Sequence, residues 1–353
     1  MCFAHPAVRT PGAAIVQSPV VTRAPAVDIH AHFFPESFLR LIEEHGAPFG
    51  VRIDRVNARG PAIVVGGVAG PPLDATYWDL DRRVRAMDRA GVTVHALSLT
   101  MPMTHWASGP VARLAAEAVN DAMAEAHAAY PDRFVGCATL PMQDPSFAAK
   151  ELERVAKLRG IRAVYLGTNV NGRELSDPGF APIFTRCEAL RLPVLLHPLS
   201  VVGAQRLQPF YLHNLLGNPF DTAIAAAHLI FGGVLDRCPK LQVCLPHAGG
   251  AFPYLFGRLQ RGQRVRPEAR DRARRPVAAY LRRFTYDTIS HSAEALRYLV
   301  ATVGADRVML GSDFCFDMGY ERPRDIITKQ ARLRPADQAR ILGGNAVRLL
   351  RVA

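Results

Sequence analysis

The stretch VDIHAHFFP, residues 27–35, ends a short apolar run with two histidines that are two positions apart. Side chains alternate between the faces of a β-strand, so a strand here would place His30 and His32 on one face, opposite Ile29. Two imidazoles that converge from one strand end can bind a metal ion. Isolated pairs of this kind also occur in loops without a metal. Other parts of the sequence are therefore needed to distinguish a metal site from two unrelated histidines.

Short apolar runs rich in β-branched residues recur along the chain, with helical periodicity between them. The runs lie at 26–32, 92–99, 133–141, 161–168, 192–198, 241–248, 284–290 and 306–314. Helical segments include 80–91, 109–130 and 146–160, and Gly91 and Gly160 stand where helix-terminating glycines are common. Eight alternations with nearly continuous apolar strands predict a closed parallel (β/α)8 barrel, the TIM barrel. An open doubly wound sheet is the alternative, but no G-x-G-x-x-G follows the first strand.

The chain is predicted to consist of a leader and one large domain. Residues 1–24 contain prolines and small residues and are expected to form a flexible leader, which leaves residues 25–353 for the barrel. Residues 48–77 alternate in hydrophobicity and are rich in glycine and proline. This pattern predicts a small β insertion after the first barrel strand, acting as a lid or side wall. Residues 335–351 have the pattern of a closing helix.

The composition is that of a globular protein. With 353 residues, of which 49% are hydrophobic, the chain can bury a large core. No apolar run approaches the roughly 18 to 20 residues needed to cross a bilayer, and the N-terminus does not have the pattern of a secretory signal, so we expect no membrane association. The six cysteines have no regular spacing. Several lie in apolar runs, which favours buried thiols in a reducing compartment and a cytoplasmic location.

The chain carries a net charge of +12, and residues 258–275 alone hold eight arginines. Surfaces that bind nucleic acid usually combine basic residues with aromatic ones and belong to recognisable modules, and neither feature is visible here. We therefore expect no nucleic-acid partner. A basic segment of this kind indicates a solvated surface, a contact between subunits or attraction of an acidic small molecule.

Polar residues close four of the eight predicted strands. The first ends in His30 and His32, the fifth in His197, the sixth in His247 and the eighth in Asp313. In a TIM barrel the C-terminal ends of all strands meet at one rim, where catalytic residues lie. Three imidazoles and a carboxylate suit a divalent cation such as Zn²⁺. The predicted ligands are His30, His32, His197 and Asp313, and His247 remains as a nearby acid or base.

The same markers resemble those of the amidohydrolase superfamily, which has H-x-H, H-P, H-x-G-G and G-S/T-D at the ends of strands one, five, six and eight. Longer stretches resemble one branch, the 2-amino-3-carboxymuconate-6-semialdehyde decarboxylase family with its aromatic-acid decarboxylase relatives. These stretches are WDLDRRVRAMDRAGV (78–92), RFVGCATLPMQDP (133–145), FGGVLDRCPKLQVCLPH (231–247) and HAGGAFPYLFGR (247–258). The resemblance covers about residues 27–350 and leaves out only the leader.

The resemblance implies non-oxidative removal of CO₂ from a small acidic substrate by a metal-dependent carboxy-lyase that works as a homodimer. It implies one divalent metal, with Zn²⁺ expected and Mn²⁺ as the alternative. The four predicted ligands match those of the family, and His247 matches its catalytic histidine, with Asp313 as a second candidate for delivering the proton. Arg258 matches an arginine that reaches a carboxylate in the neighbouring subunit's site, and Phe316 matches an aromatic residue that lines the pocket.

Some positions depart from the family. Its muconate-semialdehyde enzymes carry a second substrate-binding arginine where this chain has Pro71, and residues 60–77 contain no arginine. Arg52, Arg55 and Arg59 lie earlier and could replace it only if the insertion folds differently. These departures leave open another unsaturated or aromatic carboxylic acid as the substrate. The alternatives are a mononuclear metal-dependent hydrolase or hydratase on the same barrel and a non-catalytic binding protein.

Overall fold

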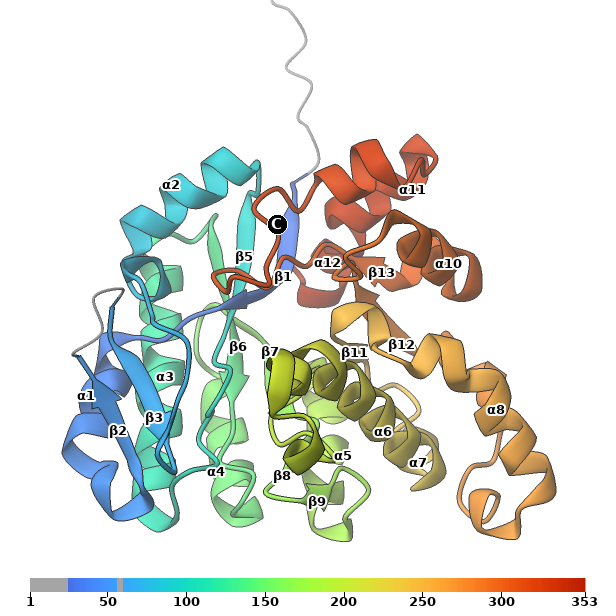
Figure 1. Cartoon of the computed structure of the whole chain (residues 1–353), viewed down its shortest axis with the longest axis horizontal. Helices are drawn as coiled ribbons and strands as arrows, with labels where there is room; N and C mark the ends of the chain where they lie inside the picture. The colour runs from blue at the N-terminus through green and yellow to red at the C-terminus, as the bar shows by residue number, and fades with distance from the viewer. Residues whose placement is uncertain (1–24, 56–59, 353) are drawn as a thin grey trace, which may run out of the picture.

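The computed structural model describes residues 25–55 and 60–352, so the predicted leader lies outside the described residues. Eight parallel strands form the central sheet (Figure 1). In order around it they are β1 (Val27–His32), β5 (Val94–Ser98), β6 (Phe134–Thr139), β7 (Ile161–Gly167), β10 (Val194–His197), β11 (Val243–Leu245), β12 (Phe284–Asp287) and β13 (Val308–Met309). The amide of Ile29 donates to the carbonyl of Leu310 at 3.0 Å, and Ala31 bridges to Phe314, so the last strand meets the first.

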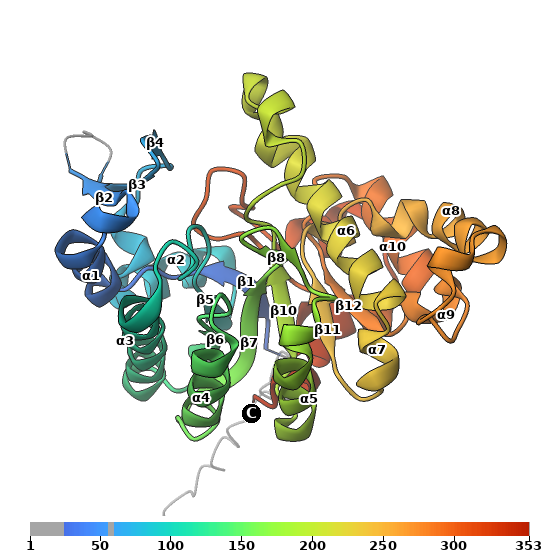
Figure 2. The same cartoon turned by 90° about the horizontal axis from the view of Figure 1, so that it is seen from below.

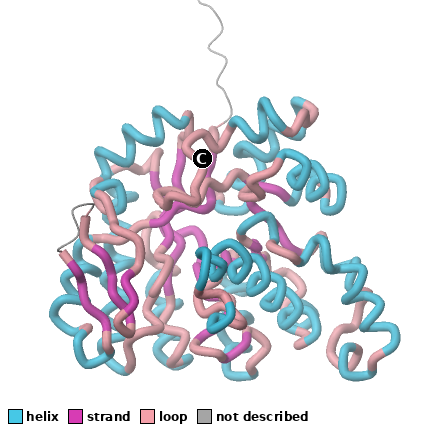
Figure 3. The backbone as a smooth tube through the Cα atoms, viewed as in Figure 1, coloured by secondary structure: helices cyan, strands magenta, loops and turns pink. Residues whose placement is uncertain are grey.

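This arrangement confirms the predicted (β/α)8 barrel. Each of the eight apolar runs contains one barrel strand, and the runs extend one to several residues beyond the strand that forms. Most strand residues are buried on both faces because side chains fill the inside of the barrel and helices cover the outside. Figure 3 shows the strands gathered at the centre with helices around them.

Twelve α-helices accompany the strands in the described part of the chain. They are α1 (Glu36–His45), α2 (Leu80–Ala90), α3 (Gly109–Ala129), α4 (Pro145–Val155), α5 (Ala181–Leu190), α6 (Asn218–Phe231), α7 (Val234–Arg237), α8 (Phe252–Val265), α9 (Val277–Leu281), α10 (Ala293–Val303), α11 (Pro335–Ala339) and α12 (Asn345–Leu350). Helix α2 begins and ends as its sequence predicts, because the Asp79 carboxylate accepts from the amide of Arg82 at 2.9 Å and Gly91 adopts a left-handed φ of 69°.

Two regions add to the barrel. A three-stranded antiparallel sheet of β2 (Val51–Asp54), β3 (Ala62–Val65) and β4 (Val68–Ala69) lies between β1 and β5, within residues 48–77 (Figure 1). A two-stranded hairpin of β8 (Asn169–Val170) and β9 (Arg173–Glu174) follows β7. The first sheet stands beside the barrel and does not extend it, because its strands pair only with one another among the described residues.

The chain leaves the barrel again before α6. Residues 203–217, which we call the projecting segment, form short 3₁₀ and π-helical turns that extend from the upper edge in Figure 2. The predicted closing helix at 335–351 consists of α11, a π-helical turn (Arg340–Gly344) and α12. None of the described helices has the length and apolar character of a membrane span.

Candidate metal centre

Four side chains from three strand ends converge at the C-terminal rim of the barrel. His30 and His32 come from β1, His197 closes β10, and Asp313 lies in the loop after β13. One ligand atom from each lies within 4.8 Å of the others, and all four residues are buried. The Nε2 atoms of His30 and His32 are 3.2 Å apart, and Asp313 Oδ1 lies 2.9 Å from His32 Nε2. The structure therefore brings together the four residues that the sequence predicts as ligands.

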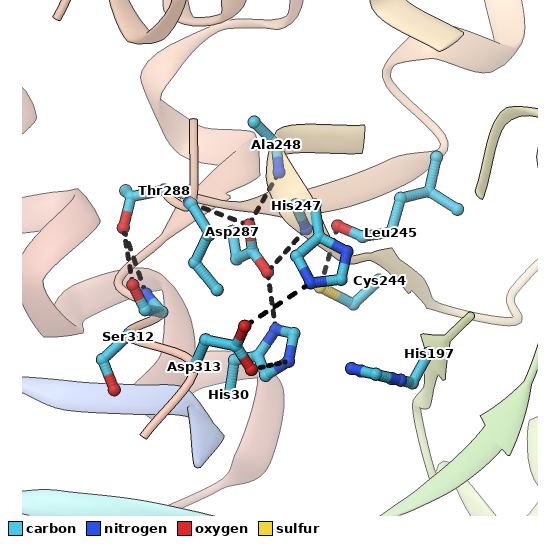
Figure 4. A network of polar contacts seen from close by, with 12 residues as sticks. His30, His197, Cys244, Leu245, His247, Ala248, Asp287, Thr288, Ser312 and Asp313 are labelled. Atoms are coloured by element: carbon cyan, nitrogen blue, oxygen red, sulfur yellow. Dashed lines mark hydrogen bonds and ion pairs between the residues drawn. The ribbon is translucent and has the colours of Figure 1, made fainter. Parts of the chain in front are cut away.

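Each imidazole is oriented through its other ring nitrogen. His30 Nδ1 lies 2.8 Å from Asp287 Oδ2, at the end of β12 (Figure 4). Ser98 Oγ is 3.3 Å from His32 Nδ1, and Thr100 Oγ1 is 3.0 Å from His197 Nδ1. Partners of this kind fix the tautomer and the ring orientation of histidines that bind metals.

The arrangement fits a cation on electrostatic grounds. The Asp287 carboxylate accepts a hydrogen bond from His30 Nδ1, so Nε2 is the His30 nitrogen that faces the other donors. Burial lowers the pKa of His30, but hydrogen bonds to Asp287 and Asp313 outweigh it and raise the pKa to about 10. Burial lowers the pKa of His32 to about 4. A divalent metal bound among the donors would take the place of the proton that these hydrogen bonds favour on His30.

Asp313 remains ionised in this setting. Burial would raise the pKa of its carboxyl group, but hydrogen bonds with His247, His30 and His32 outweigh burial and hold the pKa well below its ordinary value. Burial, together with the neighbouring histidines, lowers the pKa of His197 well below its ordinary value. The anionic carboxylate of Asp313 and the neutral imidazoles of His32 and His197 are the protonation states that metal binding needs, and His30 would release its proton when a metal binds.

His247 lies beside the four donors and is held differently. Its Nε2 atom is 3.9 Å from Asp313 Oδ2, and its buried Nδ1 atom has no hydrogen-bond partner among the described residues. Its backbone has a left-handed φ of 53°, and so does that of Ala248, at 57°. Asp287 stabilises this turn by accepting from both backbone amides, at 3.0 and 2.7 Å (Figure 4). The imidazole is therefore placed at the metal centre with one nitrogen available.

The predicted substrate contacts lie in two different places. The Phe316 ring stands at the rim, 5.2 Å from the ring of His32. Arg258 is exposed on α8, which packs against α6 on the outside of the barrel. Arg52 is exposed on β2, and Arg55 forms an ion pair with Glu43 at 2.7 Å. Arg59 lies outside the described residues.

Several residues that support the site are absent from the sequence-based prediction. Asp287 contacts both His30 and the turn at His247, and it is the last residue of β12, a charged side chain in the middle of the apolar run 284–290. That signal could have identified it. Arg83 on α2 is fully buried and donates to the carbonyl of His32. Arg83 could not be identified in the same way, because it is one of several charged residues in the predicted helical segment 80–91.

With the geometry established, comparison with known proteins places the chain. The amidohydrolase family matches residues 27–352. The chain belongs to this family. An amidohydrolase-family relative, the 2-amino-3-carboxymuconate-6-semialdehyde decarboxylase of Dictyostelium discoideum, is 34% identical over 332 residues, which cover 93% of this chain and 92% of the relative.

Solved structures of decarboxylases share the fold of this amidohydrolase-family chain. The 5-carboxyvanillate decarboxylase LigW from Sphingomonas paucimobilis has a TM-score of 0.81 at 26% identity, covering 94% of this chain and 100% of its own. A dihydroxybenzoic acid decarboxylase from Polaromonas sp. JS666, solved with bound manganese and the inhibitor 2-nitroresorcinol, has a TM-score of 0.74 at 26% identity. The match covers 93% of this chain and 97% of that one. The resemblance seen in the sequence is thereby confirmed.

Proposed function

We propose that this protein is a metal-dependent, non-oxidative decarboxylase of a small unsaturated or aromatic carboxylic acid. The observation that carries the proposal is the buried convergence of three imidazoles and one carboxylate, with His247 3.9 Å from that carboxylate. The relatives named above are decarboxylases, which supports this reaction over other chemistry on the same barrel.

The residues of the site have different roles in the proposed decarboxylation. Loss of CO₂ leaves an electron pair on the substrate carbon, and a divalent ion bound by the four donors would act as a Lewis acid for that charge. His247 is placed to deliver the proton that the carbon then needs, and Asp313 is the second candidate for this role. Phe316 offers a ring face at the rim against which an unsaturated or aromatic substrate can pack.

Zinc is the metal that we propose, with manganese as the alternative. Three imidazoles and one carboxylate suit zinc, which favours nitrogen ligands. The manganese in the Polaromonas relative supports the alternative. Metal analysis of protein purified without added metal, followed by reconstitution with each ion in turn, decides between them by the activity that each restores.

We also propose a homodimer in which Arg258 binds the substrate carboxylate in the neighbouring subunit. Arg258 is exposed on α8, and Tyr254 on the same helix is 80% exposed. Helix α6 packs against α8 and follows the projecting segment, where Phe210 is 86% exposed and Leu215 and Leu216 are also exposed. An exposed apolar surface of this kind is typical of a subunit interface.

A cytoplasmic location completes the proposal. The five cysteines in the described residues are all free, and four of them are buried. Free thiols in a protein core are characteristic of reducing compartments.

The decisive experiment follows CO₂ release from a panel of hydroxylated aromatic and unsaturated acids, including 2-amino-3-carboxymuconate-6-semialdehyde. We expect CO₂ release that a chelator abolishes and a divalent ion restores. If lactones, amides or enol acids are hydrolysed or hydrated instead, with no CO₂ released from any acid, the protein is a hydrolase or hydratase. A tightly bound substrate with no turnover in the metal-loaded protein would identify a binding protein.

A further inference from the structure

A cavity of about 760 Å³ lies at the end of the barrel opposite the metal centre. Its lining includes Pro193, Gln242 and Arg307, which immediately precede β10, β11 and β13. The metal ligands, in contrast, follow the other ends of these strands. The cavity wall is completed by the last residues of α5 and by α12. Nothing in the proposed decarboxylation uses this end of the molecule.

The lining of this N-terminal cavity is strongly basic. It contains five cationic side chains, from Arg191, Lys240, Arg307, Arg348 and Arg351, and two carboxylates. Cationic side chains therefore outnumber carboxylates in this lining. An average protein surface, in contrast, mixes both signs of charge.

Both carboxylates are already engaged. Glu188 Oε1 accepts from the backbone amides of Lys240 and Leu241. The Asp306 carboxylate accepts from Arg282 at 2.9 Å and lies 3.3 Å from Arg307 Nε. Within residues 25–55 and 60–352, the other four cations have no carboxylate partner, and the guanidinium of Arg348 contacts only the amide oxygen of Asn345. Among the described residues, the positive charge of the cavity is thus not fully balanced by carboxylates.

Two of these arginines occupy positions where glycine is the common residue. Arg191 ends α5 with a φ of 55°, and Arg351 ends α12 with a φ of 53°, both in the left-handed region. Side chains with a Cβ are disfavoured there, and glycine usually fills this position after a helix. The two helices are far apart in the sequence, but both place an arginine at this position in the wall of one cavity.

The floor of the cavity differs from its rim. Leu192, Leu241 and Met309 are buried and apolar, whereas Arg191, Lys240 and Arg348 on the rim are exposed. The volume is in the range of ligand sites for small molecules. A rim of guanidinium and ammonium groups above an apolar floor matches a ligand with an apolar body and several negative charges.

We propose that this N-terminal cavity binds a small organic anion that carries at least two negative charges, in the form of a phosphate ester or a polycarboxylate. Arg191, Lys240, Arg348 and Arg351 bind the charged groups, and the apolar floor receives the body of the ligand. The site is separate from the metal centre, so the proposal is independent of the decarboxylase activity.

Calorimetric titration of the metal-loaded protein with three probes that share one ring tests the proposal. We expect saturable binding of phenyl phosphate or of benzene-1,3,5-tricarboxylate at constant ionic strength, and much weaker binding of benzoate, which carries a single charge. Binding of only one of the two multiply charged probes supports the proposal and identifies the charged group. If neither binds at millimolar concentration, the proposal is wrong.

A double variant distinguishes binding in this cavity from binding at the proposed active site, where acids are also expected to bind. Arg191→Gly together with Arg351→Gly removes two cations and suits the left-handed backbone, so we expect the thermal stability to be retained. Binding of the multiply charged probe should weaken by at least about tenfold, since two charge-assisted contacts are lost. The control variant, Arg40→Ala with Arg113→Ala, removes the same charge from exposed positions on α1 and α3 and should bind normally. Equal binding by the wild type and the glycine variant would place the anion elsewhere and overturn the proposal.

Discussion

At the residue scale, the metal centre depends on Asp287 as much as on the four donors. Asp287 Oδ2 lies 2.8 Å from His30 Nδ1 and accepts from the amide of His247 at 3.0 Å. Burial would raise the pKa of Asp287, but hydrogen bonding to His30 and the nearby positive charges outweigh it and lower the pKa. One anion therefore aligns a predicted ligand and fixes the strained turn that carries the predicted acid.

Asp287→Asn should weaken metal binding by about 10- to 100-fold, because a neutral amide supports the His30 imidazole less well than a carboxylate. Competition with a chelating dye measures the change in affinity. The matched control is Asp132→Asn, at an exposed position in the loop before β6, which should bind metal normally. Unchanged metal affinity in Asp287→Asn would mean that the orientation of His30 does not limit binding.

His247→Ala should retain the metal but lose at least about 100-fold in turnover, since general acids contribute that much or more. Metal analysis and CO₂ release, measured on the same preparation, separate these two effects. Asp313→Ala serves as the comparison and should lose both metal and turnover, because its carboxylate lies among the donors. If His247→Ala also lost the metal, His247 would be a ligand.

The sequence was sufficient to predict residues that end an apolar strand with an unusual side chain, such as His197 and Asp313. It was not sufficient for Ser98 and Thr100, because hydroxyl residues are common at strand ends and only the folded structure shows which imidazole they contact. The helical pattern around Arg258 also cannot predict the contact that we propose for it, since that contact would involve a second chain.

At the scale of elements, barrel closure depends on a glycine. Gly343, in the π-helical turn between α11 and α12, lies so close to the start of β1 that a Cβ atom would overlap the carbonyl oxygen of Pro25. Backbone atoms cannot move aside as a flexible side chain can, so only a residue without a Cβ allows α12 to pack here.

Gly343→Ala should therefore lower the free energy of unfolding by about 1–3 kcal/mol, as is typical of overpacking. Chemical denaturation measures the change. Gly262→Ala on α8 is the control, because no atom lies within 4 Å of the added Cβ, and it should stabilise the helix by up to about 1 kcal/mol. Equal stability of Gly343→Ala and the wild type would show that the turn can shift away from β1.

Helices and strands with a long, regular apolar pattern were predicted most accurately from the sequence. Barrel strands and long helices such as α3 were predictable because their apolar pattern repeats over several residues. The predicted single helix at 335–351 missed the π-helical turn, because the wider turn arises from packing and leaves the apolar pattern almost unchanged.

At the scale of the whole molecule, the homodimer that we propose would complete the substrate site of each barrel with a residue of its partner. Arg258 lies on the outer helix α8, whereas the metal centre lies at the C-terminal ends of the strands. Among the described arginines near the insertion, Arg55 is already paired with Glu43. A second copy of the chain, seated against α8 and the projecting segment, would bring the missing guanidinium to the substrate.

Mixed dimers test this arrangement. His247→Ala and Arg258→Ala should each be inactive alone, the first because it lacks the acid and the second because the partner's site loses its carboxylate contact. When the two are co-expressed with different tags, one site of each heterodimer combines an intact His247 with an intact Arg258 from the partner. Activity should therefore return in the doubly purified heterodimer, at the level of one working site for every two chains. If Arg258 served its own barrel, every site would keep a defect and no activity would return.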